Sequence, residues 1–175
     1  MLNIYLAGEI HSDWRDDIIQ LTKKNDLNVN FSSPVTDHDA SDNCGVEILG
    51  DEETQFWKDN KGAKLNAIRT RKEIENSDIV IVKFGEKYKQ WNAAFDAGYA
   101  AALNKSLIII HSDEHQHALK EVDAAALAVV KNNDQEWQTI NQGIFRSRYN
   151  NTDYQIYDVV NMSSTENISQ DADLN

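Results

Sequence analysis

The sequence contains one cysteine and one proline among its 175 residues. The lone thiol, at Cys44, cannot form an intramolecular disulfide, so we expect the protein to work in a reducing compartment. There is no run of about 18 apolar residues, and the first residues do not combine a basic segment with an apolar stretch. These absences predict a cytoplasmic protein with no membrane partner.

Basic residues are also scarce. The 17 Lys and Arg residues are outnumbered by 29 Asp and Glu residues, which gives a formal net charge of −12. A net charge of this sign opposes contact with the phosphate backbone of a nucleic acid or with an anionic membrane. We therefore expect a small-molecule ligand and no nucleic-acid partner.

The length and the apolar content suit a single domain with a sizeable core, because 41% of the residues are hydrophobic. The stretch 151–175 differs, since it has no Lys or Arg and few apolar residues. A segment of this composition buries too little apolar surface to offset the entropy cost of ordering. We predict one α/β domain over residues 1–150 and an acidic, disordered tail over residues 151–175.

Short apolar runs alternate with amphipathic stretches along the chain. The runs typical of buried strands are 3–7, 27–31, 78–84, 107–110 and, more weakly, 127–130. The stretches typical of helices are about 12–24, 63–76, 91–103, 119–124 and 134–149. The polar, acidic segment 36–61 is predicted to be a long loop. This alternation predicts a three-layer, doubly wound α/β fold, flavodoxin- or Rossmann-like, with a five-stranded parallel sheet.

Ligands of such sheets bind beyond the carboxyl ends of the strands. That rule selects the segments that follow the first three predicted strands, and Asp96 is a notable residue within them. It falls in the second turn of the predicted helix 91–103, among small apolar residues. A carboxylate in that setting can attack an electrophilic carbon. The alternative is an exposed acid on an amphipathic helix.

Aromatic and basic residues nearby allow two interpretations each. Trp91, Phe95 and Tyr99 are expected to pack the helix against its neighbours rather than to form a platform for base stacking. Arg69 and Arg71 precede the third strand, and their guanidinium groups suit a phosphate or a carboxylate. Ion pairing with Glu73 and Glu75 explains these arginines nearly as well.

Two groups of histidines and acids have the side chains that bind metal ions. One is formed by His11, His38 and Asp39, and the other comprises His111, Asp113, His115 and His117. Neither group has a diagnostic ligand spacing. We expect no metal and no other cofactor.

Several motifs resemble a known superfamily. Tyr5-Leu6-Ala7-Gly8 and Phe95-Asp96-Ala97-Gly98-Tyr99-Ala100 resemble the nucleoside 2-deoxyribosyltransferases, which open on an aromatic-apolar strand running into Gly. Three longer motifs are similar to the YtoQ family within that superfamily, namely Gly8-Glu9-Ile10-His11-Ser12, His38-Asp39-Ala40-Ser41-Asp42-Asn43 and Phe84-Gly85-Glu86-Lys87-Tyr88-Lys89-Gln90-Trp91-Asn92. The likeness covers roughly residues 1–148.

The resemblance implies a nucleoside 2-deoxyribosyltransferase-like fold and a matching chemistry. The implied enzyme is an N-glycosidase or a deoxyribosyltransferase-like protein that acts on a nucleoside or nucleotide through a carboxylate nucleophile. Because superfamily members form oligomers, a homo-oligomer is also implied. The alternative is a non-catalytic module that binds or senses a nucleoside or nucleotide on the same fold, and a purely structural role is a third interpretation.

The resemblance also assigns residues. Asp96 stands where the superfamily places its nucleophilic Glu, Tyr5 matches a tyrosine that orients the nucleophile, and Glu9 is a candidate second acid, with Asp39, Asp42 and Glu86 as others. The superfamily often has an acid six residues before the nucleophile and a small Gly between them, where this sequence has Gln90 and Asn92. The expected substrate-binding residues are Gly8, His11, His38, Asp39, Ser41, Asp42, Asn43, Gly85, Glu86, Gln90, Trp91 and Asn92.

Overall fold

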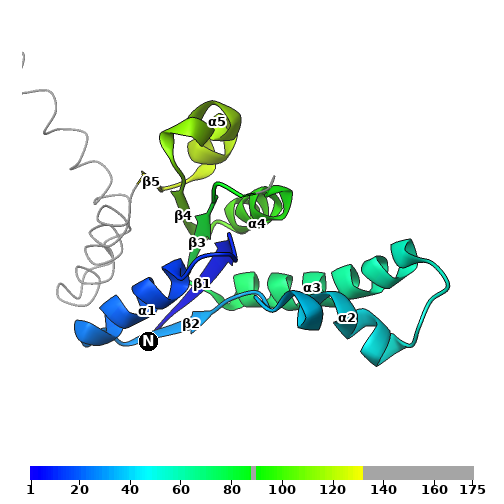
Figure 1. Ribbon diagram of the computed structural model, residues 1–175. Coiled ribbons are helices and arrows are strands. Elements are labelled where there is room, and N and C mark those ends of the chain that lie inside the picture. The colour runs from blue at the N-terminus through cyan, green and yellow to red at the C-terminus, as the bar shows by residue number, and fades with distance from the viewer. Residues whose placement is uncertain (88–89, 132–175) are drawn as a thin grey trace, which may run out of the picture.

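The computed structural model describes residues 1–87 and 90–131. Its centre is a five-stranded sheet with the strand order β2-β1-β3-β4-β5 (Figure 1). All four pairs of neighbouring strands are parallel. The strands are β1 (Leu2–Gly8), β2 (Val29–Ser32), β3 (Ile79–Lys83), β4 (Ser106–Ile110) and β5 (Ala128–Val130). The predicted α/β fold with five parallel strands is therefore confirmed.

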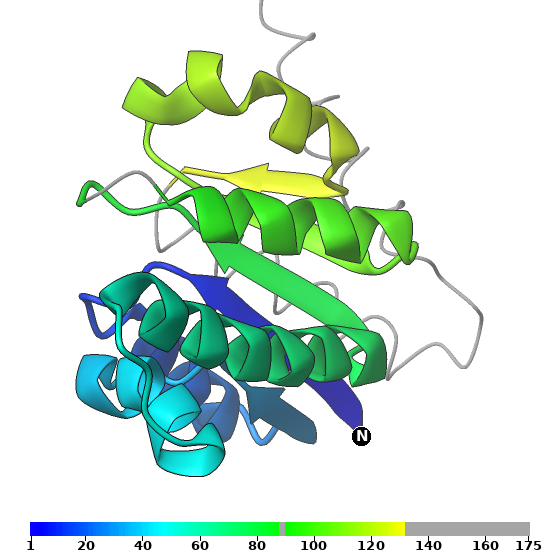
Figure 2. The ribbon, with the colours of Figure 1, turned by 90° about the vertical axis from the view of Figure 1, so that its right-hand side faces the viewer.

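Helices cover both faces of the sheet, because alternate residues of each buried strand point to opposite sides. The helices are α1 (Trp14–Lys24), α2 (His38–Leu49), α3 (Gln55–Asn76), α4 (Trp91–Ala102) and α5 (Gln116–Ala125), with a short 3₁₀ turn η1 (Asp113–His115) before α5. Ile4 and Leu6 of β1 pack with Trp14 of α1. Tyr5 faces the other side, in a cluster formed with α3, α4 and α5. Figure 2 shows these three helices in front of the sheet.

The predicted loop over 36–61 was wrong, since most of that segment is helical. The side chain of Asp37 caps α2 by accepting a hydrogen bond of 2.9 Å from the Ala40 amide. Helix α2 then packs closely on α3, where a Cβ added at Gly45 would lie 2.2 Å from the Gly62 nitrogen. Two glycines at the crossing thus let polar helices approach each other. Their exposed faces account for the loop-like composition.

Two predictions lie outside the described residues, namely the helix over 134–149 and the tail over 151–175.

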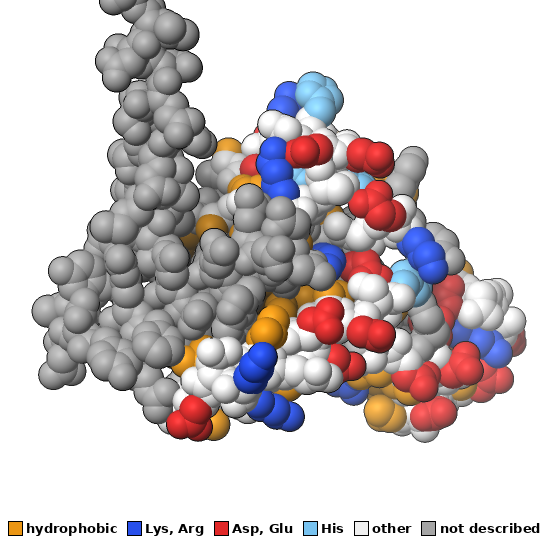
Figure 3. Space-filling model, turned by 60° about the vertical axis from the view of Figure 1, so that its left-hand side comes forward, with side chains coloured by type: hydrophobic (Ala, Val, Ile, Leu, Met, Phe, Trp, Pro, Cys, Tyr) orange, Lys and Arg blue, Asp and Glu red, His pale blue; other side chains and the backbone are white. Residues whose placement is uncertain are grey.

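On the face drawn in Figure 3, acidic side chains are spread over the described surface with Lys and Arg between them. In residues 1–87 and 90–131, no helix combines the length and the apolar character that crossing a membrane requires.

Gly8 is the point where β1 leaves the sheet, and only glycine suits its conformation. Its φ is +93°, and a Cβ there would lie 2.1 Å from the Lys83 carbonyl oxygen. We expect Gly8→Ala to lower the free energy of unfolding by about 3 kcal/mol, because it combines an unfavourable φ with a clash against backbone. Urea denaturation measures this loss.

The matched control for that substitution is Gly98→Ala, on the exposed side of α4. A Cβ at Gly98 meets nothing within 4 Å, and Ala favours helix over Gly by up to about 1 kcal/mol. Gly98→Ala should therefore be neutral or stabilising. Equal stability of the two variants would contradict the described course of the chain at Gly8.

Candidate functional site

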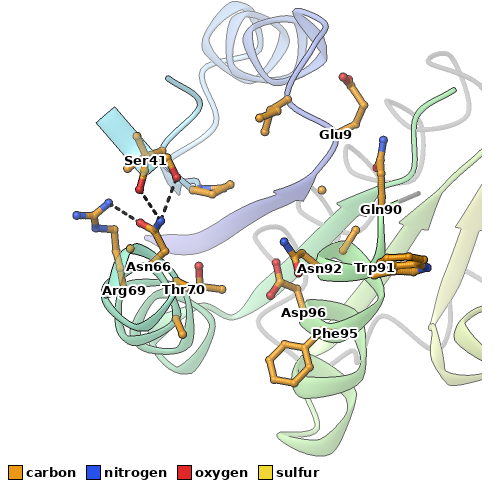
Figure 4. Close-up of a pocket in the computed structure, with 18 of the residues that line it drawn as sticks. Glu9, Ser41, Asn66, Arg69, Thr70, Gln90, Trp91, Asn92, Phe95 and Asp96 are labelled. Atoms are coloured by element: carbon orange, nitrogen blue, oxygen red, sulfur yellow. Dashed lines mark hydrogen bonds between the residues drawn. The ribbon is translucent and has the colours of Figure 1, made fainter. Parts of the chain in front are cut away.

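A cavity of about 790 Å³ opens beyond the carboxyl end of β1. Its walls come from the turn 8–11 after β1, the first half of α2, the middle of α3 and the start of α4, with smaller contributions from residues 34–35 after β2 and from Lys87 after β3. Figure 4 shows the α3 wall and the α4 wall facing each other. The cavity thus lies where a parallel sheet of this type is expected to bind ligands.

Asp96 lies in the α4 wall of this cavity. Ala93, Ala97 and Ala100 form the buried face of α4, and Asp96 is half-buried beside that face. Burial raises the pKa of its carboxyl from 3.8 to about 7. Figure 4 shows the carboxyl facing Thr70 of α3. A carboxyl that exchanges its proton near neutrality, in a cavity wall, is a typical feature of a reactive site.

Tyr5 of β1 is fully buried and does not itself line the cavity. Its hydroxyl donates a hydrogen bond of 3.4 Å to Thr70 Oγ1. Burial raises the Tyr5 pKa to about 12, and the negative charge of Asp96 contributes in the same direction. The charge of Asp96 therefore acts on the Tyr5 hydroxyl. Thr70, a residue that the sequence analysis did not identify, holds that hydroxyl by the hydrogen bond.

Glu9 is buried at the turn after β1, with 7% of its surface exposed. Its carboxylate accepts hydrogen bonds from the His11 amide and the Ser12 hydroxyl. Burial alone would raise the Glu9 pKa, but these hydrogen bonds outweigh burial and lower it. Glu9 is consequently an ionised group. Its position requires a glycine opposite, because a Cβ at Gly85 would lie 2.1 Å from Glu9 Cγ.

Arg15 fixes the backbone of the same turn, and sequence reasoning missed this role. Its buried guanidinium donates hydrogen bonds to the carbonyl oxygens of Leu6 at 3.1 Å, Gly8 at 3.1 Å and Glu9 at 2.5 Å. The Trp14 indole donates a further one, of 2.8 Å, to the Glu9 carbonyl oxygen. The turn beside the cavity is therefore held rigidly. A buried arginine at the start of α1 gives no signal in a single sequence.

The start of α4 differs from expectation in its aromatic residues. Trp91 and Phe95 are 75% and 59% exposed, so the prediction that they pack the helix was wrong. Alanines occupy the face of α4 that meets the sheet, which turns both rings toward the cavity rim. Asn92 also lines the cavity. The other interpretation of these rings, a platform for base stacking, stays a prediction.

Gln90 lines the cavity too, but it also holds the loop that follows β3. Its side-chain oxygen accepts a hydrogen bond of 3.2 Å from the Gly85 amide. Its side-chain nitrogen donates one of 3.0 Å to the Lys87 carbonyl oxygen. The side chain of Gln90 is thus engaged in loop structure.

The remaining predicted residues divide between two cavities and the outer surface. His11, Ser41 and Asp42 line the larger cavity, whereas Gly85 and Glu86 line a smaller one of about 300 Å³ that shares Glu9 and His11. Asp39 and Asn43 are exposed and line neither cavity. Their neighbours Ser41 and Asp42 line the larger cavity while these two do not, because a helix distributes neighbours around its axis. The His38 side chain lies outside the described part of the chain.

The two histidine groups do not gather into a metal site in the described part of the chain. Across residues 1–87 and 90–131, no three His, Cys, Asp or Glu side chains are grouped to hold a metal ion. His111 is instead buried. Its Nε2 lies 3.1 Å from both carboxylate oxygens of Asp123, so its ring serves the packing of β4 against α5.

Solved structures with the same arrangement of strands and helices define the class of fold. A 2-deoxyribosyltransferase from Bacillus psychrosaccharolyticus matches with a TM-score of 0.50 and 16% identity over 83% of this chain and 94% of that chain. A conserved protein from Enterococcus faecalis V583 matches with a TM-score of 0.54 and 16% identity over 81% and 98% of the two chains. The fold is therefore that of the nucleoside 2-deoxyribosyltransferase-like proteins.

Within that class, the chain belongs to the family described as nucleoside 2-deoxyribosyltransferase YtoQ, whose model matches residues 5–142. It is 45% identical over 141 residues to the uncharacterized protein YtoQ of Bacillus subtilis strain 168, a match that covers 81% of this chain and 90% of the relative. The expected family and fold are both confirmed.

Proposed function

We propose that this protein acts at the N-glycosidic bond of a nucleoside or nucleotide, as a hydrolase or a transferase, with Asp96 as the nucleophile. The observation that supports the proposal best is the position of the Asp96 carboxyl, half-buried in the wall of a large cavity with a pKa raised to about 7 by burial. The family is described as nucleoside 2-deoxyribosyltransferase YtoQ, and one structural neighbour is a 2-deoxyribosyltransferase, which supports the same chemistry.

The proposed reaction has two displacement steps. In the first, the Asp96 carboxylate bonds to the anomeric carbon, and the bond to the base breaks. The base leaves with the bonding electron pair and takes a proton from water in the open cavity. In the second, water or another base attacks the same carbon and releases Asp96, so the sugar keeps its configuration.

Three side chains would support Asp96 in this scheme. Tyr5 and Thr70 form a hydrogen-bonded pair; Thr70 faces the carboxyl in Figure 4, the charge of Asp96 acts on Tyr5, and we assign both residues the task of positioning the carboxyl. Glu9, which is held ionised, would stabilise the positive charge that develops on the sugar ring. Asn92 and the aromatic rim, Trp91 and Phe95, are the proposed contacts for sugar and base.

A panel of nucleosides, deoxynucleosides and their monophosphates tests the proposal. Each compound is incubated with the protein, and free base is measured by chromatography. Release of base from at least one member supports N-glycosidic chemistry. Thermal stabilisation by a compound that stays intact would instead support the second candidate, a binding or sensing module.

The second candidate rests on one specific observation. The position that often carries an acid in the superfamily is Gln90, and its amide is committed to holding Gly85 and Lys87. A protein that kept the cavity but lost the acid pair would bind a ligand without cleaving it. The panel experiment separates the two candidates.

We also propose that the protein forms a homo-oligomer through the α2–α3 hairpin. Figure 1 shows the hairpin extending away from the sheet, and it carries several exposed apolar side chains: Ile48, Leu49, Phe56 and Trp57. Such side chains typically become buried at contacts between subunits. We expect sedimentation velocity to show a dimer or larger species that Trp57→Glu shifts toward monomer. A monomer at all concentrations would contradict this.

A further inference from the structure

Helix α3 presents a polar wall to the cavity, on the side opposite Asp96. Asn66 and Thr70 are one turn apart and lie on one face of the helix. Asn66 is fixed by hydrogen bonds of 3.0 Å from its side-chain nitrogen to the backbone and the hydroxyl oxygens of Ser41 in α2. Figure 4 shows Asn66 and Thr70 across the cavity from Asp96. The wall is thus held in place independently of any ligand.

Two arginines flank this wall. Arg69 and Arg71 lie on either side of Thr70 along the helix, and both line the cavity. Arg69 is on the α2 side, with its Nη1 3.5 Å from Asn66 Oδ1. Arg71 is on the α4 side, close enough for its charge to act on the Tyr99 hydroxyl. Long side chains from both flanks can therefore reach a single group placed over Thr70.

Among the residues that the structure describes, neither arginine forms a salt bridge with a carboxylate. In the described ranges 1–87 and 90–131, the salt bridges formed by α3 use Lys58, Lys61 and Lys72. Glu75, a candidate partner by sequence, pairs with Lys72 and accepts a hydrogen bond of 2.9 Å from the Tyr99 hydroxyl. The alternative of ion pairing is therefore not what the structure shows. The chain has a net charge of −12, so two guanidinium groups without a salt bridge in a cavity wall favour an anionic ligand.

We infer that this wall binds the phosphate group of the substrate, so that the substrate class is a nucleoside monophosphate rather than a free nucleoside. The inference rests on the proposed function for the sugar and base, which lie nearer to Asp96. Planar guanidinium forks match the oxygens of a phosphate. The Thr70 hydroxyl, which accepts a hydrogen bond from Tyr5, can donate a neutral hydrogen bond beside them, while Asn66 stays bound to Ser41. A free nucleoside would leave both arginines without an anionic partner.

Ribose 5-phosphate and ribose test the wall without involving the glycosidic bond. Calorimetric titration is carried out with the wild-type protein, Arg69→Gln, Arg71→Gln and Lys64→Gln. Lys64 is an exposed residue of α3 that does not line the cavity, so it controls for the loss of one positive charge. Both arginines are exposed as well, and their replacement should leave the fold intact.

We expect the wild-type protein to bind ribose 5-phosphate at least about tenfold more tightly than ribose, and each arginine variant to lose about tenfold in affinity for the phosphate. Lys64→Gln should retain wild-type affinity. Added salt should weaken the binding of ribose 5-phosphate, because exposed charges are screened. Equal binding of the two sugars, or an equal loss in Lys64→Gln, would overturn the inference.

The outcome also separates this inference from the proposed function. Arginine-dependent binding of ribose 5-phosphate, with no base released from any nucleotide, would contradict the proposed chemistry but support the phosphate site. The opposite result is equal release of base from nucleosides and monophosphates, by the wild type and the arginine variants alike. It would contradict the phosphate site but support the proposed chemistry.

Discussion

Replacing Asp96 with Asn is expected to lower kcat for base release by about three orders of magnitude or more. The amide has nearly the shape of the carboxyl, but it cannot attack the anomeric carbon, and loss of a nucleophile has effects of this size. Single-turnover measurement of free base gives the rate. The result would be specific to the cavity carboxyl, because the substitution leaves the buried alanine face of α4 unchanged.

Two further variants sharpen that result. Glu121→Gln removes an exposed acid of α5 that lies outside both cavities, and it should retain the wild-type rate. Asp96→Glu keeps the charge but moves it by about 1 Å, which should cost on the order of a hundredfold. Base release that persists at the wild-type rate in Asp96→Asn would exclude Asp96 as the nucleophile.

The same Asp96→Asn variant is expected to be more stable than the wild type at pH 8. The Asp96 pKa is raised from 3.8 to about 7 in the folded protein, so the folded state disfavours the charged form. The free energy of unfolding therefore falls as the pH rises through this window, and the full penalty is present above pH 7. Asn carries no charge, so the Asn variant lacks the cost of burying a carboxylate. We expect this cost to be on the order of 2 kcal/mol because the side chain is only half-buried.

Chemical denaturation at pH 4 and pH 8 measures this difference. The two proteins should have nearly equal stability at pH 4, where the Asp96 carboxyl is largely protonated in the folded state, and should diverge at pH 8. Glu121→Gln again provides the control, with no pH-dependent change relative to wild type. A wild type as stable as Asp96→Asn at pH 8 would show that Asp96 is solvated and carries no burial penalty.

The sheet and the general place of the site follow from local patterns in the sequence. The apolar runs of β1, β3 and β4 are short, continuous and bounded by turn residues, which identifies buried parallel strands. Parallel strands end at one edge, so Gly8, Glu9 and the start of α4 could be expected to converge. The structure places all three around one cavity.

The composition of α2 concealed its helix. Its residues are polar and acidic, and it is stabilised by the Asp37 cap and by close approach to α3 at Gly45 and Gly62. Contacts of this kind join residues far apart in sequence. A single sequence carries no record of them, and a polar segment with glycines is typical of a loop.

Individual residues of the site were harder to predict than its position in the fold. Thr70 and Arg15 act through partners on other elements, the Tyr5 hydroxyl and the carbonyl oxygens at the end of β1. Trp91 and Phe95 were expected to be buried because aromatic side chains usually are. On α4 the alanines take the sheet-facing positions, and the small side chains bring the helix axis so close that the aromatic rings remain outside.

The Asp96 carboxyl itself provides the most direct test of this account. Its side-chain carbon can be observed by carbon-13 NMR, assigned by its absence in Asp96→Asn, and titrated with and without ribose 5-phosphate. The account predicts a midpoint near pH 7 in the free protein and a displaced midpoint when the ligand occupies the cavity. A midpoint near the ordinary value of 3.8, unmoved by ligand, would contradict it.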